Sequence, residues 1–124
     1  MDADEPQLRA LASAYAAEGG ALWIADEGDG MIAARPGPEN RWEICRVYVM
    51  PARHGTGLGA SLLQTAEQHA LAFGARDFEL WTDSRFIRAH RFYEKHGYRK
   101  LPEQRELHDT NGPFVEFRYW KSAV

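Results

Sequence analysis

Apolar residues recur at intervals of three and four along three stretches of the chain and alternate or cluster along others, which predicts three helices among short strands. The first helix has its apolar positions at Leu8, Leu11, Ala12 and Tyr15. Asp4 and Gln7 are placed to cap its start, and Gly19-Gly20 ends it. The runs ALWIA and MIAAR flank the glycine-containing DEGDG, which predicts a hairpin of two strands.

The middle of the chain predicts a strand, a helix and a second strand. The segment WEICRVYVM, Trp42 to Met50, is rich in β-branched and aromatic residues, so we expect a central, buried strand that Pro51 ends. The following helix has one apolar stripe, formed by Leu62, Leu63, Ala66, Ala70 and Phe73. Gly74 is its expected C-terminal cap. Asp77 to Thr82 predicts the second strand, parallel to the first because a helix separates them.

The last third of the chain predicts a helix and a terminal pair of strands. The helix runs from about Arg85 to His96, ahead of Gly97, and its apolar positions are Phe86, Ala89, Phe92 and Tyr93. YRKL, a polar connection from Pro102 to Pro113, and the alternating FVEFRYW complete the chain. This order indicates an α+β fold: a mixed, mostly antiparallel twisted sheet with one parallel βαβ crossover and helices on both faces. We expect a single domain over residues 1–124.

Composition narrows the class of protein. Apolar residues make up 44% of the chain and charged residues 27%, as in globular proteins, and a net charge of -3 argues against a general nucleic-acid binder. Because MDADEPQ does not resemble a signal peptide and no apolar run could cross a bilayer, we expect a cytoplasmic protein. Cys45 is expected to be a small buried hydrophobe, and His69, His90 and His96 lack metal-ligand spacing, so no metal site is expected.

The glycine-rich RHGTGLG lies directly before the second helix, where unpaired backbone N–H groups can bind an anion. A P-loop is excluded, because Gly59 is followed by Ala60-Ser61 and not by Lys. Gly55, Gly57 and Ala60, with Asp83 as a distant acid, match a dinucleotide-binding fingerprint only weakly, since the chain predicts a single crossover.

A third interpretation fits the motifs better. VYVMPARHGTGLGASLL, followed about thirty residues later by AHRFYEKHGY, resembles the GNAT superfamily of acyl-CoA-dependent N-acyltransferases over Glu43 to Leu101. The matching positions are His54, Gly57 and Gly59 in the first motif and Ala89, Tyr93, Gly97 and Tyr98 in the second. His54 replaces the usual Arg or Gln, and Phe86 stands where many relatives have Asn. Only one helix precedes the hairpin, so the N-terminal part is short for the family.

The resemblance implies an N-acetyltransferase in which a primary amine attacks the thioester of acetyl-CoA directly. It implies that backbone groups of Val47 and Val49 bind the pantetheine arm. The diphosphate would lie on Arg53, His54, Gly55, Thr56, Gly57, Leu58, Gly59 and Ala60. Tyr93 would be the general acid and Glu43 the general base. The basic run Arg85 to Arg91 either reaches the adenosine 3′-phosphate or is a solvated helix face.

Several alternatives stay open at this point. Trp42, Trp81 and Trp120 either shape an acceptor pocket or, more commonly for large aromatics in strands, belong to the core. The alternative function is a non-catalytic acyl-CoA-binding module. The amine acceptor cannot be identified from the sequence, and we expect no nucleic-acid or membrane partner. A chain this short with a terminal β segment is expected to form a homodimer.

Overall fold

The computed structural model describes residues 5–124, so the expected cap Asp4 lies outside the described residues. The helices are α1 (Glu5–Ala17), α2 (Leu58–Ala72) and α3 (Ile87–Lys95). The strands are β1 (Ala21–Ala25), β2 (Gly30–Pro36), β3 (Arg41–Val49), β4 (Asp77–Asp83), β5 (Arg99–Asp109) and β6 (Gly112–Ser122). Short 3-10 turns occupy Asp26–Gly28, Pro38–Asn40 and Pro51–Arg53. All the predicted elements are therefore present.

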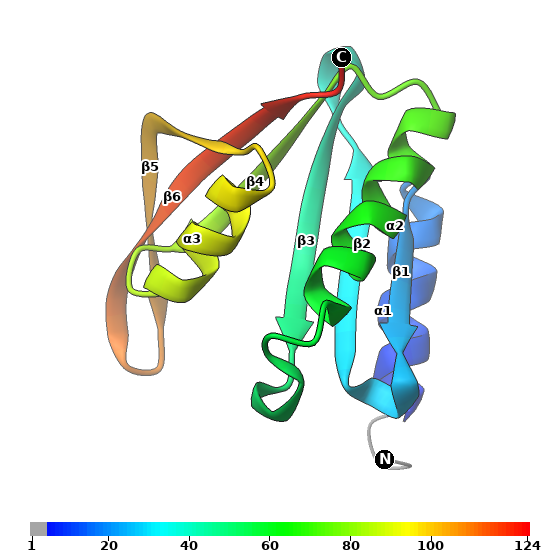
Figure 1. The fold of residues 1–124 in the computed structure, drawn as a ribbon, viewed down its shortest axis with the longest axis horizontal. Coiled ribbons are helices and arrows are strands. Elements are labelled where there is room, and N and C mark those ends of the chain that lie inside the picture. Colours follow the sequence, from blue (N-terminus) through cyan, green and yellow to red (C-terminus); the bar gives the residue numbers. More distant parts are fainter. Residues whose placement is uncertain (1–4) are drawn as a thin grey trace.

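The six strands form one sheet in the order β1-β2-β3-β4-β6-β5, in which only β3 and β4 are parallel. Figure 1 shows α2 and α3 in front of the sheet and α1 behind it. The helix α2 joins the parallel pair as the crossover that the sequence predicts. The expected α+β architecture with helices on both faces is confirmed.

The main core lies between the sheet and α2, with contributions from α3. It is built from alternate residues of the strands and from the predicted stripe of α2, and its members include Ile32, Ala34, Trp42, Ile44, Leu62, Leu63, Ala66, Phe78, Leu80 and Tyr119. On the other face, Tyr15 of α1 is buried, as is Ala33 of β2. The prediction was wrong for two residues of the apolar stripes. Phe73 is 67% exposed and Phe86 is 58% exposed, because Phe73 follows the last residue of α2 and Phe86 precedes the first residue of α3.

The C-terminal part differs from the prediction. The connection expected between Pro102 and Pro113 is strand for most of its length, since β5 runs to Asp109 and pairs with β6 up to Asp109 opposite Gly112. Pro102 lies where the register shifts between Lys100 and Gln104. As an edge strand, β5 exposes most of its side chains, which explains its polar sequence. Among residues 5–124, no helix is long and apolar enough to span a bilayer.

Candidate functional site: the opening between β3 and β4

The parallel strands β3 and β4 part after a short paired segment. They pair only through Arg41 with Asp77, Trp42 with Phe78 and Glu43 with Glu79, whereas β4 continues alongside β6 to its last residue. The second half of β3 therefore lacks a neighbour on one side. This corrects the expectation of a fully buried strand, because Trp42 and Ile44 are buried whereas Tyr48 is 49% exposed.

A bulge in β3 turns its side chains at the place where the strands part. Arg46 has a φ of 56°, and the pairing with β2 moves from Cys45 opposite Ala33 to Tyr48 opposite Met31, which leaves an extra residue in β3. After the bulge, Val47 and Val49 pack against the main core. Tyr48, between them in the strand, points to the opposite side.

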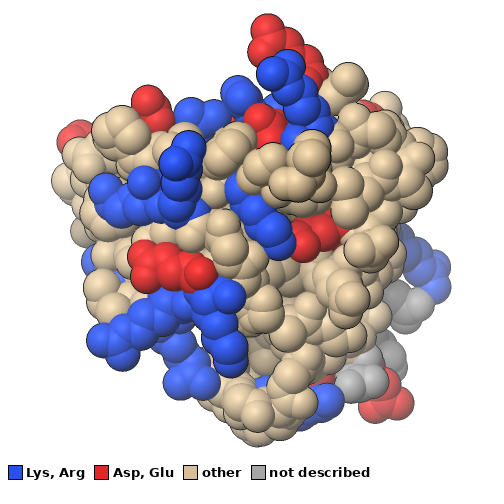
Figure 2. All heavy atoms as spheres, turned by 45° about the horizontal axis from the view of Figure 1, so that its top comes forward, with Lys and Arg blue, Asp and Glu red and all other residues tan. Residues whose placement is uncertain are grey.

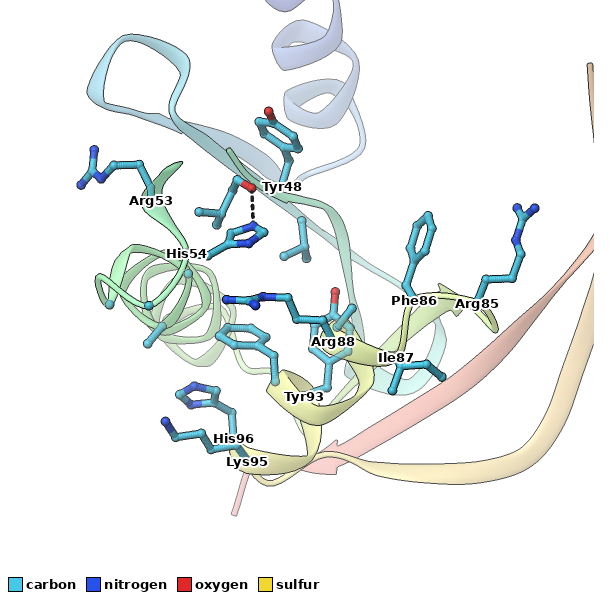
Figure 3. Close-up of a pocket in the computed structure, with 18 residues that line it drawn as sticks. Tyr48, Arg53, His54, Arg85, Phe86, Ile87, Arg88, Tyr93, Lys95 and His96 are labelled. Carbon is cyan, nitrogen blue, oxygen red and sulfur yellow. Dashed lines mark hydrogen bonds between the residues drawn. The ribbon is translucent and has the colours of Figure 1, made fainter. Parts of the chain in front are cut away.

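A cavity of about 850 Å³ fills the opening. Its lining comes from the end of β3, the glycine loop, the start of α2 and one side of α3 (Figure 3). Of the predicted site residues, it brings together Val47, Val49, Arg53, His54, Gly55, Gly57, Gly59, Ala60 and Tyr93. Motifs that lie about thirty residues apart in the sequence thus meet in one cavity.

The glycine loop presents backbone N–H groups at the cavity. Gly55 and Gly57 have φ angles of 79° and 89°, which favour glycine, and a Cβ at Gly59 would lie 3.3 Å from the Phe92 ring. Five backbone N–H groups in this segment have no hydrogen-bond acceptor among residues 5–124. They belong to Gly55, Gly57, Leu58, Gly59 and Ala60. A helix start with unpaired N–H groups and a flexible approach is suited to an anion.

Fixed positive charges surround the same cavity. Its lining includes Arg53, Arg85, Arg88 and Lys95, and no Asp or Glu among the described residues. Arg53 donates to Asp29 over 2.8 Å, while Arg88 makes no hydrogen bond or ion pair within residues 5–124. Figure 3 shows Arg88 extending from α3 across the cavity, on the side of His54. The arrangement favours a ligand with several negative charges.

The charge is uneven over the whole molecule. Residues 85–124 carry nine of the 15 Lys and Arg but only five of the 18 Asp and Glu. In Figure 2, Lys and Arg accordingly gather on the side of the molecule where α3, β5 and β6 lie in Figure 1. The net charge of -3 therefore conceals a basic C-terminal third next to the cavity.

His54 does not extend freely into the cavity. Its Nε2 lies 2.9 Å from the carbonyl oxygen of Val49, and because a carbonyl can only accept, Nε2 carries the hydrogen. The side chain thus connects the loop to the last residue of β3. This contact keeps the loop next to the end of β3, although position 54 has neither the guanidinium of Arg nor the amide of Gln.

Tyr93 is the one hydroxyl-bearing residue of α3 in the cavity wall. Its side chain is 6% exposed and packs edge-on against the rings of Phe92 and Tyr98. Burial raises the pKa of Tyr93, so the phenol keeps its proton at neutral pH. No residue of 5–124 hydrogen-bonds the hydroxyl, which leaves it able to donate to a ligand.

The end of β4 is fixed to α3 by polar contacts. Asp83 accepts from Arg85 Nε at 2.9 Å and Arg85 Nη2 at 2.6 Å, and these bonds lower the pKa of the carboxyl to about 2. His90, which is buried, has Nε2 2.8 Å from the Asp83 carbonyl oxygen. The basic run is therefore divided, since Arg85 is paired while Arg88 faces the cavity.

Three predicted site residues lie elsewhere. Glu43 is on the paired part of β3, does not line the cavity, and accepts from Arg35 Nε at 2.9 Å. Thr56 and Leu58 are in the loop and the first turn of α2, but the Thr56 hydroxyl donates to the Arg53 carbonyl and Leu58 packs against the core. The structure does not bring Glu43 together with Tyr93.

Other residues with open interpretations are also placed. Trp42 is in the core, and neither Trp81 nor Trp120 lines the cavity. Cys45 is partly buried, and burial raises the pKa of its thiol to about 11, which keeps it protonated and unreactive as a nucleophile. Within residues 5–124, no group of three His, Cys, Asp or Glu side chains could hold a metal ion.

The sequence analysis missed several cavity residues on α3. Arg88, Phe92, Lys95 and His96 line the cavity without having been assigned to it individually. His96 lies three positions after Tyr93, and helical periodicity puts these two side chains on one face. The spacing from Tyr93 could therefore have indicated that His96 lines the cavity. No local pattern could have indicated this for Tyr48, because its direction depends on the bulge in β3.

Comparison with known proteins agrees with this geometry. The model of the Acetyltransferase (GNAT) family matches residues 2–98. An aminoalkylphosphonate N-acetyltransferase from Salmonella typhimurium is 40% identical over 58 residues, which are 47% of this chain and 38% of that protein. An uncharacterized N-acetyltransferase from Archaeoglobus fulgidus is 36% identical over 58 residues, 47% of this chain and 40% of its own length. The matched segment thus spans about two fifths of these relatives.

Solved structures resemble the chain over most of its length. A GNAT-family acetyltransferase from Staphylococcus aureus superposes with a TM-score of 0.76 at 20% identity, covering 98% of this chain and 78% of that one. An aminoglycoside 6′-N-acetyltransferase complexed with coenzyme A gives 0.70 at 19% identity, covering 90% and 77%. These likenesses show the fold, and the family model accounts for well over half of the sequence. The chain belongs to the GNAT acetyltransferase family.

Proposed function

We propose that this chain transfers an acetyl group from acetyl-CoA to a primary amine. The observation that carries the proposal is the set of unpaired backbone N–H groups at Gly55, Gly57, Leu58, Gly59 and Ala60, opening into a cavity lined by cations. Coenzyme A is a polyanion whose diphosphate suits such a helix start. Arg88, which extends across the cavity from α3, adds a cation on the opposite wall.

The pantetheine arm would continue from the loop along β3. Beyond Glu43 this strand has no partner on the side of β4, which leaves that side of Val47 and Val49 available to the amides of the arm, although the Val49 carbonyl already accepts from His54 Nε2. The close approach of Gly59 to Phe92 brings α2 and α3 together at the base of the cavity. Such a course would lead the thioester toward Tyr93.

In the reaction, the amine nitrogen forms a bond to the thioester carbonyl carbon and the carbon–sulfur bond breaks. Tyr93 would donate its hydroxyl proton to the departing thiolate, since its raised pKa keeps it protonated. The proton lost by the amine needs an acceptor. Glu43 is our proposed base and, from its place outside the cavity, would act through water.

A non-catalytic acyl-CoA-binding module is the second candidate. Phe86 and His54 favour it, because both replace polar side chains that the family motifs place beside the cofactor. The module would use the same cavity and the same backbone N–H groups, but no residue would need to transfer a proton. We further propose that the chain is cytoplasmic and forms a homodimer.

Calorimetric titration of coenzyme A, followed by thiol release from acetyl-CoA with a panel of amines, tests the proposal. We expect heat of binding from coenzyme A, an affinity that weakens with added salt, and turnover with at least one amine. Binding without turnover on any amine would favour the module. The absence of binding heat would refute both, because the glycine loop would then have another purpose.

A further inference from the structure

The cavity has two ends of different chemistry. At one end lie the glycine loop, His54 and Arg88, with Lys95 and His96 beyond them. Figure 3 shows the Tyr48 side chain, on β3 near His54, and the Phe86 side chain, beside Arg85 just before α3, both pointing away from Arg88 and Tyr93. The proposed course of coenzyme A does not explain an exposed tyrosine at position 48 or an apolar ring at position 86, where many relatives have Asn.

Stability does not explain the two rings. Tyr48 is 49% exposed and Phe86 58% exposed, so neither contributes a fully buried side chain to the core. Phe86 is the N-cap residue of α3 and makes no side-chain cap hydrogen bond, although Ser, Thr, Asp or Asn would stabilise the helix at that position. Two large apolar rings on one side of a cavity mouth indicate a ligand surface.

Within residues 5–124, no carboxylate lines the cavity to bind an additional positive charge. The lining contains four Lys and Arg and, among the described residues, neither Asp nor Glu. Asp83, next to Arg85, already accepts hydrogen bonds from that guanidinium on both carboxylate oxygens. Glu43 is likewise engaged by Arg35. An acceptor with several ammonium groups would meet repulsion without a compensating acid.

We infer that the acceptor is a monoamine on an aromatic or other apolar skeleton, held between Tyr48 and Phe86 with its amine directed at the thioester. The inference rests on the proposed acetyl transfer and names its acceptor class. Ring stacking gives the aromatic members of that class an additional advantage. Polyamines and aminoglycosides are poor acceptors for this chain.

The test compares kcat/KM for 2-phenylethylamine, ethanolamine, spermidine and kanamycin in the unaltered chain and in Phe86→Ala and Tyr48→Ala. We expect 2-phenylethylamine to be the best acceptor, and each truncation to lower its kcat/KM roughly 2- to 12-fold more than it lowers that of ethanolamine, as for one lost aromatic pair. Phe73→Ala is the matched control, because Phe73 is also a large exposed ring but lies outside the cavity. It should change none of these values.

Binding of 2-phenylethylamine to the protein saturated with coenzyme A separates this inference from the proposed function. Amine binding that both truncations weaken, without turnover, would support the acceptor class and refute catalysis. Turnover with spermidine or kanamycin preferred would refute the acceptor class and leave catalysis standing. Two further results would also overturn the inference: truncations that alter the preference among acyl-CoA chain lengths and not among amines, or that change only the oligomeric state.

Discussion

Two glycines at opposite ends of α2 offer a controlled test of the anion site. Gly57 precedes the helix with a φ of 89°, and Gly74 follows it with a φ of 87°. At both positions, a Cβ would meet no atom within 4 Å. An alanine at either position therefore has the same backbone strain and no steric clash, but only the one at residue 57 lies in the cavity wall.

Both substitutions should lower stability equally. A left-handed conformation costs an L-residue roughly 1–2 kcal/mol. For a chain of 124 residues, the average unfolding entropy converts this loss to a fall in Tm of about 4 to 8 °C. Thermal unfolding followed by circular dichroism measures it for Gly57→Ala and Gly74→Ala side by side.

Coenzyme A affinity should separate the two variants. If the diphosphate binds this loop as proposed, the methyl group of Gly57→Ala would hinder its approach, and loss of one hydrogen bond to a charged group, about 1.5–3 kcal/mol, would weaken binding roughly 10- to 150-fold. Gly74→Ala should bind like the unaltered chain, as calorimetry below the lower Tm would measure. Equal weakening in both variants, or none in Gly57→Ala, would refute the assignment of this loop to the diphosphate.

Three other predictions concern titratable groups. Tyr93→Phe should lower kcat by about 10²- to 10⁴-fold and leave coenzyme A affinity unchanged; a variant with full turnover would remove Tyr93 from the mechanism. Glu43→Gln should shift the acidic limb of the pH–rate profile, and an unmoved profile would assign the amine proton to another group or to solvent. Because the folded-state pKa of Asp83 is lowered to about 2, its stabilising contribution is complete above its ordinary pKa of about 4 and is lost as pH falls toward 2. Urea unfolding between pH 5 and pH 2 should therefore show a steeper loss of stability in the unaltered chain than in Asp83→Asn, and parallel curves would contradict this.

The sequence was sufficient to predict the helices and strands, and to pick out glycine-loop and α3 residues that line the cavity. Gly57 and Gly59 are fixed by the loop-to-helix transition, and Tyr93 by its helical register with Ala89. Helical periodicity did not predict burial correctly at the ends of the helices. Phe73 and Phe86 fit the apolar stripes by spacing, but they lie just outside α2 and α3, where the chain no longer follows the helical rotation.

Features that depend on which strands separate could not be predicted from local patterns. WEICRVYVM predicts a buried strand throughout, yet Arg46 and Tyr48 in its second half are exposed, and β4 no longer pairs with it after Glu79. The sequence also gives no sign of the bulge at Arg46, although the bulge decides which face of the sheet Val47 and Tyr48 each take. Glu43 has the chemistry of a base, but its position on the paired segment gives it Arg35 as a partner.

The short β3–β4 ladder has a mechanical consequence. Since β3 and β4 are paired through three residue pairs at one end, those pairs would be the pivot of any opening motion, and the part of β3 from Glu43 to Val49 would move as an arm of about 20 Å. A rotation of about 10° there would widen the far end by roughly 3.5 Å, close to the thickness of an aromatic ring. Glu67 of α2 opposes that rotation, because it accepts from the Tyr98 hydroxyl at 2.6 Å and from Lys121 Nζ at 3.1 Å on the other half. Glu67 therefore links α2 to the other half of the sheet and would limit the separation of the two halves.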